Sequence, residues 1–240
     1  MDSKREYRMI PIEVVNWING RETVAESRQT FEKLSPHSGE MICKVSRSTK
    51  LDVDNAIVAA KTAQVGWAST PAVRRGYLLH QICNELEVQK DEVASIVALE
   101  TGKSNKEALG EVEGAIALGR FYAGEGQRLY GRTTTSGVEN KYSSTVRQPC
   151  GVAGLIIAAN TPIANIAWKV FPALICGNGL VLKAAEDAPT TAWIFTKIAH
   201  KVGLPNGVLN VIQGLGIEAG SPLVEHNDVD VISFTGSTCV

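Results

Sequence analysis

Residues 151–240 carry the feature that most restricts the fold, an alternation of short apolar runs with longer helical segments. The runs lie in GVAGLIIAAN, LVLKAAE, GVLNVIQG and VDVISFTG, and stretches of helical spacing separate them. Runs that are apolar at consecutive positions, rather than at every second one, are typical of strands buried on both faces. Such strands, joined by helices, form parallel βαβ units. We therefore expect an α/β fold with a Rossmann-like, doubly wound parallel sheet.

The residues before this core change character twice. Residues 1–50 have the pattern of extended segments and turns, and helical spacing begins at Leu51. Helices continue to residue 127, with Gly102 as a stop, and we expect residues 1–127 to supply a helical layer around the sheet. Residues 128–150 are polar and rich in Thr and Ser, without the apolar face of a core element. This composition predicts a β-hairpin arm that protrudes from the body.

Charge and hydropathy exclude two classes of partner. The formal net charge is −1, so the chain has no basic field to recruit nucleic acid or anionic lipid. The longest apolar run, VAGLIIAA at residues 152–159, is less than half of a membrane span. The first residues, MDSKREYRMIPIEVVNW, have mixed charge and no apolar core, which is unlike a secretory signal. We expect neither a nucleic-acid nor a membrane partner.

The cysteines and histidines argue against disulfides and metal sites. The cysteines are Cys43, Cys83, Cys150, Cys176 and Cys239. Because they are odd in number and widely scattered, isolated buried thiols in a reducing compartment are the better interpretation, and we expect the protein in the cytosol. We take Cys239 as structural, since no histidine or other base stands near it. The histidines show no metal-ligand spacing, so no metal is predicted.

Candidate ligand-binding residues follow from one rule of parallel sheets, in which ligands bind beyond the carboxyl ends of the strands. The rule selects residues 159–161, 183–186, 213–216 and 235–238. These segments offer the amide of Asn160, the cation of Lys183, the anion of Glu186 and glycine turns at Gly214 and Gly236. A lysine and a glutamate three residues apart can both reach ribose hydroxyls, and a glycine turn can approach a pyrophosphate closely. The set can hold a dinucleotide.

Each of the polar residues also has a structural interpretation. Asn160 can be a turn former or helix cap, Lys183 a solvated strand end, and Glu186 the cap of the next helix. Two motif matches are weak. ETGKS at residues 100–104 lacks the glycine of a P-loop, because Val97 stands at the required position. GLGIEAG at residues 214–220 is one residue too long for the dinucleotide fingerprint.

Longer motifs show a specific family resemblance. In chain order they are WINGR, LETGK, QPCGVAGLIIAAN, GNGLVLKAAEDAP, GLPNGVLNVIQGLG and VISFTGST, and they cover nearly the whole chain. With this order and separation the chain resembles the NAD(P)-dependent aldehyde dehydrogenases. The resemblance implies that Asn160 is the oxyanion-hole asparagine, whose amide stabilises a tetrahedral thiohemiacetal.

The resemblance also implies a cofactor site. Lys183 and Glu186 match the pair that binds the adenosine ribose hydroxyls, and Gly214 matches the glycine turn near the adenine. Gly236 and Ser237 match the turn beside the pyrophosphate and nicotinamide. The implied cofactor is NAD, because a carboxylate at Glu186 would repel the 2′-phosphate of NADP. Binding of NADP is also possible.

The family's nucleophilic cysteine and general-base glutamate lie downstream of residue 240. We therefore expect the amino-terminal part of an enzyme that oxidises an aldehyde to an acid, and we expect this chain to be inactive alone. Residues 1–127 and 151–240 would then belong to an incomplete cofactor-binding domain. Residues 128–150 resemble the family's oligomerisation hairpin, which implies homodimers or tetramers.

Two alternatives stay open. The chain can belong to the branch of the family that transfers the acyl group to coenzyme A. It can also be a naturally short, non-catalytic protein that binds a nucleotide or another subunit. Ala158 and Ala159 stand where the family often has a proline and an aromatic residue, so the aldehyde is not identified.

Overall fold

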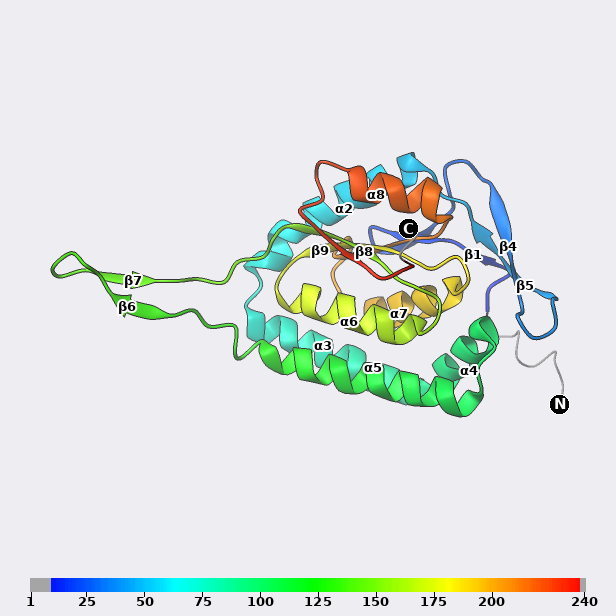
Figure 1. Ribbon diagram of the computed structural model, residues 1–240, viewed down its shortest axis with the longest axis horizontal. Helices are drawn as coiled ribbons and strands as arrows, with labels where there is room; N and C mark the ends of the chain where they lie inside the picture. Colours follow the sequence, from blue (N-terminus) through cyan, green and yellow to red (C-terminus); the bar gives the residue numbers. More distant parts are fainter. Residues whose placement is uncertain (1–9, 238–240) are drawn as a thin grey trace.

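A central sheet organises the chain, whose computed structural model describes residues 10–237 (Figure 1). The sheet has six strands in the order β11-β8-β9-β10-β2-β3. They are β2 (Asn16–Ile18), β3 (Arg21–Thr23), β8 (Val152–Ile156), β9 (Gly179–Lys183), β10 (Leu209–Ile212) and β11 (Val231–Phe234). The last four are mutually parallel, and β2 and β3 add an antiparallel edge. The predicted α/β fold is confirmed.

Helices cover both faces of this sheet. α6 (Pro162–Ile175) and α7 (Pro189–Lys201) pack on one face, and α2 (Lys50–Ser69) and α8 (Ser221–Glu225) lie on the other (Figure 1). α3 (Ala72–Val88), α4 (Lys90–Thr101) and α5 (Asn105–Glu125) form a further layer outside α6 and α7. The sheet is therefore doubly wound, and only part of the amino-terminal helical layer touches it directly.

Local sequence signals set several helix ends. A capping box starts α5, in which the Ser104 hydroxyl accepts from the Glu107 N–H and the Glu107 carboxylate accepts from the Ser104 N–H. α4 ends at Gly102, which has a left-handed φ of 75° that glycine adopts without strain. Pro162 and Pro189 occupy the first turns of α6 and α7, where their missing N–H groups are not needed.

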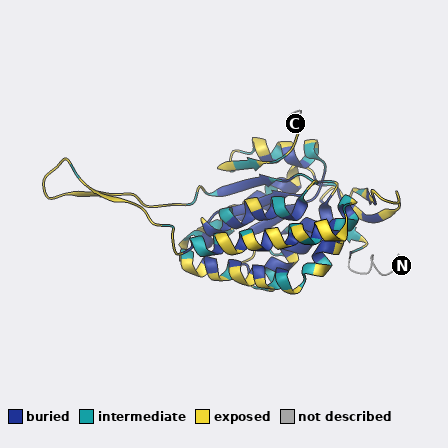
Figure 2. Cartoon of the chain, turned by 60° about the horizontal axis from the view of Figure 1, so that its bottom comes forward, coloured by how far each residue is buried: buried dark blue, intermediate teal, exposed yellow. Residues whose placement is uncertain are grey.

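The core lies between the sheet and the helices. Every residue of β9 and β10 is buried. Phe171 of α6 meets Phe195 of α7 edge to face, with ring centroids 5.8 Å apart. Full burial of such a side chain stabilises the fold by roughly 1.5–3 kcal/mol. Figure 2 shows the buried strands enclosed by helices whose outer faces are exposed. This packed body gives the strand ends fixed positions.

The segment before α2 is extended, as expected, and it forms two sets of strands. β2 and β3 join the central sheet beside β10. β1 (Glu13–Val14), β4 (Thr30–Leu34) and β5 (Met41–Ser46) form a separate small sheet in the order β1-β5-β4. Residues 10–50 therefore contribute strands to the body as well as turns.

Residues 128–150 form an arm that extends far from the body (Figure 1). Its strands β6 (Thr133–Thr135) and β7 (Tyr142–Ser144) pair only with each other within the described residues. All residues of both strands are exposed, and Tyr142 and Val146 keep 79% and 78% of their surface accessible (Figure 2). An isolated two-stranded hairpin is marginally stable in water, so the arm gains little stability from its own strand pairing.

The expectation of isolated buried thiols is right for two cysteines and wrong for two. Cys43 and Cys83 are buried, and burial raises the pKa of each thiol to about 12. Cys150 and Cys176 are exposed, because one precedes β8 at the base of the arm and the other follows the last turn of α6. Cys239 lies outside the described residues.

Candidate functional site

The predicted ligand-binding residues lie along one edge of the sheet. Across neighbouring strands the paired terminal residues are, in order, Phe234, Ile156, Lys183 and Ile212. Because the strands are parallel, the segments that follow them emerge on the same side. The structure thus places Gly236, Asn160, Glu186 and Gly214 along the carboxyl edge, each after a different strand.

Lys183 and Glu186 form an ion pair at the end of β9. The Lys183 Nζ lies 2.5 Å from Glu186 Oε2, and the lysine side chain is only 3% exposed. The glutamate side chain keeps 42% of its surface accessible. Burial opposes ionisation of Glu186, but the Lys183 ammonium and the Gly216 N–H outweigh it, so the pKa of this carboxyl lies below its ordinary value. The pair therefore presents a charged carboxylate to solvent.

The cap of α7 is supplied by a residue other than Glu186. Glu100 of α4 is fully buried, and its two carboxylate oxygens accept from the N–H groups of Thr190 and Thr191 at 2.6 and 2.8 Å. The Thr191 hydroxyl adds a bond of 2.7 Å to the same carboxylate. The interpretation of Glu186 as a helix cap is therefore wrong, and its carboxylate, paired with Lys183, remains partly exposed.

The glycines at the carboxyl edge differ in whether their surroundings leave room for a side chain. Gly214 has φ 140°, and a Cβ there would lie 3.1 Å from the Ser48 backbone nitrogen. Gly214 is therefore required by its own backbone and neighbours. Gly216, which begins the short η2 (Gly216–Gly220), is open, since the nearest atom to an added Cβ would be Glu186 Oε1 at 3.9 Å. The free space of this turn lies beside the Lys183–Glu186 pair.

The turn after β11 is less enclosed. Gly236 packs under the ring of Phe234, which leaves no room for a Cβ, and Ser237 is exposed. The Thr235 N–H donates to the Ile156 carbonyl, so the turn starts directly beside β8.

Asn160 follows β8 and is exposed. Thr161, rather than Asn160, is the N-cap residue of α6, so the helix-cap interpretation of Asn160 is wrong. Asn165 donates to Asn160 Oδ1 over 3.4 Å, while Asn160 Nδ2 has no hydrogen bond to any residue from 10 to 237. The side-chain amide of Asn160 thus offers a free donor at the edge.

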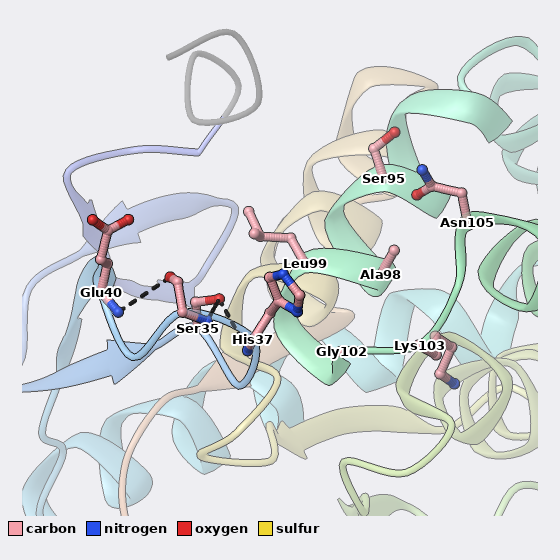
Figure 3. A pocket seen from close by; sticks show the side chains of 10 residues that line it. Ser35, His37, Glu40, Ser95, Ala98, Leu99, Gly102, Lys103 and Asn105 are labelled. Atoms are coloured by element: carbon pink, nitrogen blue, oxygen red, sulfur yellow. Dashed lines mark hydrogen bonds between the residues drawn. The ribbon is translucent and has the colours of Figure 1, made fainter. Parts of the chain in front are cut away.

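A cavity of about 550 Å³ adjoins Asn160. It is lined by Lys33, Leu34, Ser35, Pro36, Gly39, Glu100, Thr101, Lys103, Ala159, Asn160 and Asp187. A second cavity of about 310 Å³ lies between the turn after β4 and the junction of α4 with α5 (Figure 3). Lys103 borders both, so this lysine stands between the outer helices and the Asn160 turn.

Lys169 is a candidate that the sequence predictions missed. It lies on α6, is only 8% exposed, and its Nζ donates to the Ser233 hydroxyl of β11 at 2.9 Å. No carboxylate within residues 10–237 pairs with it. Burial therefore lowers the pKa of its ammonium. A lone lysine within the apolar stretch IAWKVFPALI was the available signal, and such perturbed groups concentrate at functional sites.

Lys169→Met is expected to stabilise the chain at pH 7 by about 1 kcal/mol, because it removes an unpaired buried charge. The folded-state pKa of Lys169 lies below the unfolded value, so the wild type regains stability as pH rises through the interval between the two. In urea unfolding, the difference in unfolding free energy between Lys169→Met and the wild type should therefore be smaller at pH 10 than at pH 7. Lys201→Met, at an exposed lysine, is the control. If Lys169→Met proved less stable than the wild type at pH 7, the assignment of an unfavourable buried charge would be wrong.

Two further features concern metals and membranes. Within residues 10–237, no group of three His, Cys, Asp or Glu side chains could hold a metal ion. No helix in that range is both long and apolar enough to cross a bilayer.

Comparison with known proteins decides the family. The sequence model of the aldehyde dehydrogenase family matches residues 23–240. The chain belongs to the aldehyde dehydrogenase family. Two curated aldehyde dehydrogenases show the extent of the match. The mitochondrial benzaldehyde dehydrogenase of Antirrhinum majus is 40% identical over 92% of this chain and 42% of its own length. The NADP/NAD-dependent aldehyde dehydrogenase PuuC of Escherichia coli is 36% identical over 92% of this chain and 45% of its own.

Solved aldehyde dehydrogenases have the same fold. One from Burkholderia cenocepacia superposes with a TM-score of 0.93 at 34% identity, over 95% of this chain and 47% of its own. A betaine aldehyde dehydrogenase from Staphylococcus aureus, solved in complex with NAD+, superposes with a TM-score of 0.92 at 28% identity. The match covers 95% of this chain and 46% of that enzyme. The chain therefore spans less than half the length of the aldehyde dehydrogenases it matches.

Proposed function

We propose that residues 1–240 are the amino-terminal part of an enzyme that oxidises an aldehyde to a carboxylic acid with NAD(P). The observation that carries the proposal is the convergence of the Lys183–Glu186 pair and the free amide of Asn160 on one edge of the sheet. The chain belongs to the aldehyde dehydrogenase family and spans less than half of its relatives, which supports a nucleophile outside it.

The residues of the edge fit a dinucleotide. The Lys183 ammonium can donate to one hydroxyl of the adenosine ribose while the Glu186 carboxylate accepts from the other. The open face of Gly216 leaves space for the adenosine beside this pair. Gly236 and Ser237 can turn backbone N–H groups toward the pyrophosphate. NAD would accept the hydride of the aldehyde, and Glu186 favours NAD over NADP because it would repel a 2′-phosphate.

Asn160 has the chemistry needed for the carbonyl oxygen. In the proposed reaction, a cysteine thiolate supplied from outside the chain attacks the aldehyde carbonyl and forms a carbon–sulfur bond. The carbonyl oxygen takes up negative charge as its double bond opens. The free Asn160 Nδ2 can donate to this oxygen and stabilise the thiohemiacetal. Hydride loss then leaves a thioester, which water hydrolyses to the acid.

Two alternatives to this function are an enzyme that transfers the acyl group to coenzyme A and a short, non-catalytic binding protein. Transfer to coenzyme A would replace water in the final step, and residues outside the chain would decide it. A short non-catalytic protein would have to tolerate the exposed edge strand β11, where Val231 and Phe234 keep 39% and 44% of their surface accessible. Exposed apolar strands at sheet edges invite association, so this observation disfavours a chain that acts alone.

A second copy of the chain is the partner that we propose for the arm. Its exposed Tyr142 and Val146 are apolar surface that an oligomer would cover. The scattered free thiols support a reducing compartment, and we propose the cytosol. Three relatives, from Antirrhinum majus, Arabidopsis thaliana and Homo sapiens, are named mitochondrial.

The gene and one absorbance assay test the proposed function. If the coding frame continues past Val240 into a glutamate on a glycine-rich loop and then a cysteine, the encoded full-length enzyme should form NADH from NAD and an aldehyde. Residues 1–240 alone should form none. A stop codon directly after Val240, or a full-length product without aldehyde-dependent NADH formation, would refute the oxidoreductase proposal.

A further inference from the structure

Lys103 connects the outer helices to the turn that carries Asn160. It lies between α4 and α5, with a side chain only 18% exposed. Its Nζ lies 2.5 Å from Glu111 Oε2 and donates to the main-chain oxygen of Asn160 at 2.9 Å. Because the ammonium bonds the backbone, it fixes the position of Asn160 without using the side-chain amide.

Glu111 holds the other end of the same turn. Its side chain is 7% exposed, and Oε1 accepts from the N–H groups of Ile163 and Ala164 at 3.0 and 3.2 Å. Thr161, the N-cap residue of α6, makes no side-chain capping bond, so a carboxylate from α5 satisfies this helix start. The Lys103–Glu111 ion pair therefore hydrogen-bonds to the backbone at both ends of residues 160–164.

We propose that Lys103 and Glu111 are positioning residues that aim the Asn160 amide at the reacting carbonyl oxygen. The inference rests on the proposed role of Asn160 and adds to it. Oxyanion stabilisation needs a donor within hydrogen-bond distance of the developing charge, and a displacement near 1 Å can lower a rate on the order of 100-fold. Asn160 is exposed, so the surrounding side chains do not hold it by burial. The contacts of its backbone do so instead.

A more exposed ion pair between two helices serves as the control for this one. Lys201 and Glu85 join α7 to α3 with a distance of 2.6 Å, which is similar to that of Lys103 and Glu111. Neither Lys201 nor Glu85 contacts residues 160–164 through a hydrogen bond within the described part of the chain. Loss of that pair removes an interhelical ion pair and leaves the Asn160 turn untouched.

The test uses the full-length enzyme with Lys103→Met, Lys103→Arg, Asn160→Ala, the double variant Lys103→Met/Asn160→Ala, and Lys201→Met as control. We expect Lys103→Met to lower kcat roughly 10- to 100-fold with little change in the aldehyde KM. Lys103→Arg keeps the positive charge and several N–H donors, so this variant should retain most of kcat. The double variant should be no slower than Asn160→Ala, because Lys103 acts only through the Asn160 amide, which is already absent in that background.

The outcomes separate the inference from the function on which it rests. If Asn160→Ala is slow while Lys103→Met keeps normal kcat, the positioning role is wrong and the oxyanion role stands. If the two losses multiply in the double variant, Lys103 acts independently of Asn160 and the inference fails. If Asn160→Ala is as fast as the wild type, both fail together.

A measurement on residues 1–240 adds a readout without catalysis. Glu111→Met, which removes the acceptor of both bonds, should speed hydrogen exchange at the amides of Ile163 and Ala164, and Glu85→Met should leave them unchanged. Unchanged exchange in the Glu111 variant would show that the carboxylate does not hold the start of α6, which would overturn the inference even if the variant folds normally.

Discussion

Asn160→Ala in the full-length enzyme is expected to lower kcat on the order of 100- to 1,000-fold while the aldehyde KM changes little. The amide is exposed at the end of β8, and its Nδ2 is free of hydrogen bonds to the described residues. Removing it leaves the fold intact but removes a donor whose interaction strengthens as negative charge develops. Such a loss acts on the transition state more than on bound substrate. Steady-state rates of NADH formation measure both constants.

Two controls sharpen this prediction. Asn160→Asp keeps the size of the side chain and replaces the donor with a negative charge, so it should be at least as slow as the alanine variant. Asn84→Ala removes an exposed amide from α3 in the outer layer and should match the wild type. An Asn160→Asp enzyme with normal kcat would contradict an oxyanion role, because a carboxylate cannot stabilise an adjacent oxyanion.

Glu100→Ala is expected to destabilise the chain by about 3 kcal/mol. The carboxylate is fully buried and accepts three bonds from Thr190 and Thr191. Its removal leaves these buried donors without their acceptor, and unsatisfied buried donors are more unfavourable than exposed ones. It also removes the tie between α4 and α7. Urea unfolding of residues 1–240 gives the change in free energy directly.

Glu107→Ala is the matched control for Glu100. Glu107 also accepts an N–H at the start of a helix, but solvent reaches it and can replace the carboxylate. The expected loss is therefore much smaller than that of Glu100→Ala. Equal losses in the two variants would show that burial of Glu100 is not what makes its bonds important.

The residues at the carboxyl edge of the sheet were predictable because the periodicity of apolar residues shows where the strands end. Continuous apolar strands indicated a parallel sheet, and the position of Asn160, Lys183, Glu186 and Gly214 followed from where those strands end. Lys169 was visible as a charge in an apolar helix. Its burial was not, because it depends on the packing of α6 against β11.

The supporting contacts were not predictable from local sequence. Glu100 reaches Thr190 across 90 residues, and Lys103 reaches Asn160 across 57. A single carboxylate or lysine has no pattern that names such a partner. The strands β2 and β3 are three residues each, too short for an alternation of apolar and polar residues to indicate their place beside β10.

Calorimetric titration of residues 1–240 with NAD tests the central claim, that the carboxyl edge of the sheet is a cofactor site. We expect saturable binding with a dissociation constant below about 1 mM, weaker binding of NADP, and at least a roughly tenfold loss of NAD affinity in Lys183→Met. Lys201→Met, at the far end of α7, should bind as the wild type does. NAD binding that is absent, or that is unchanged in Lys183→Met, would contradict the account.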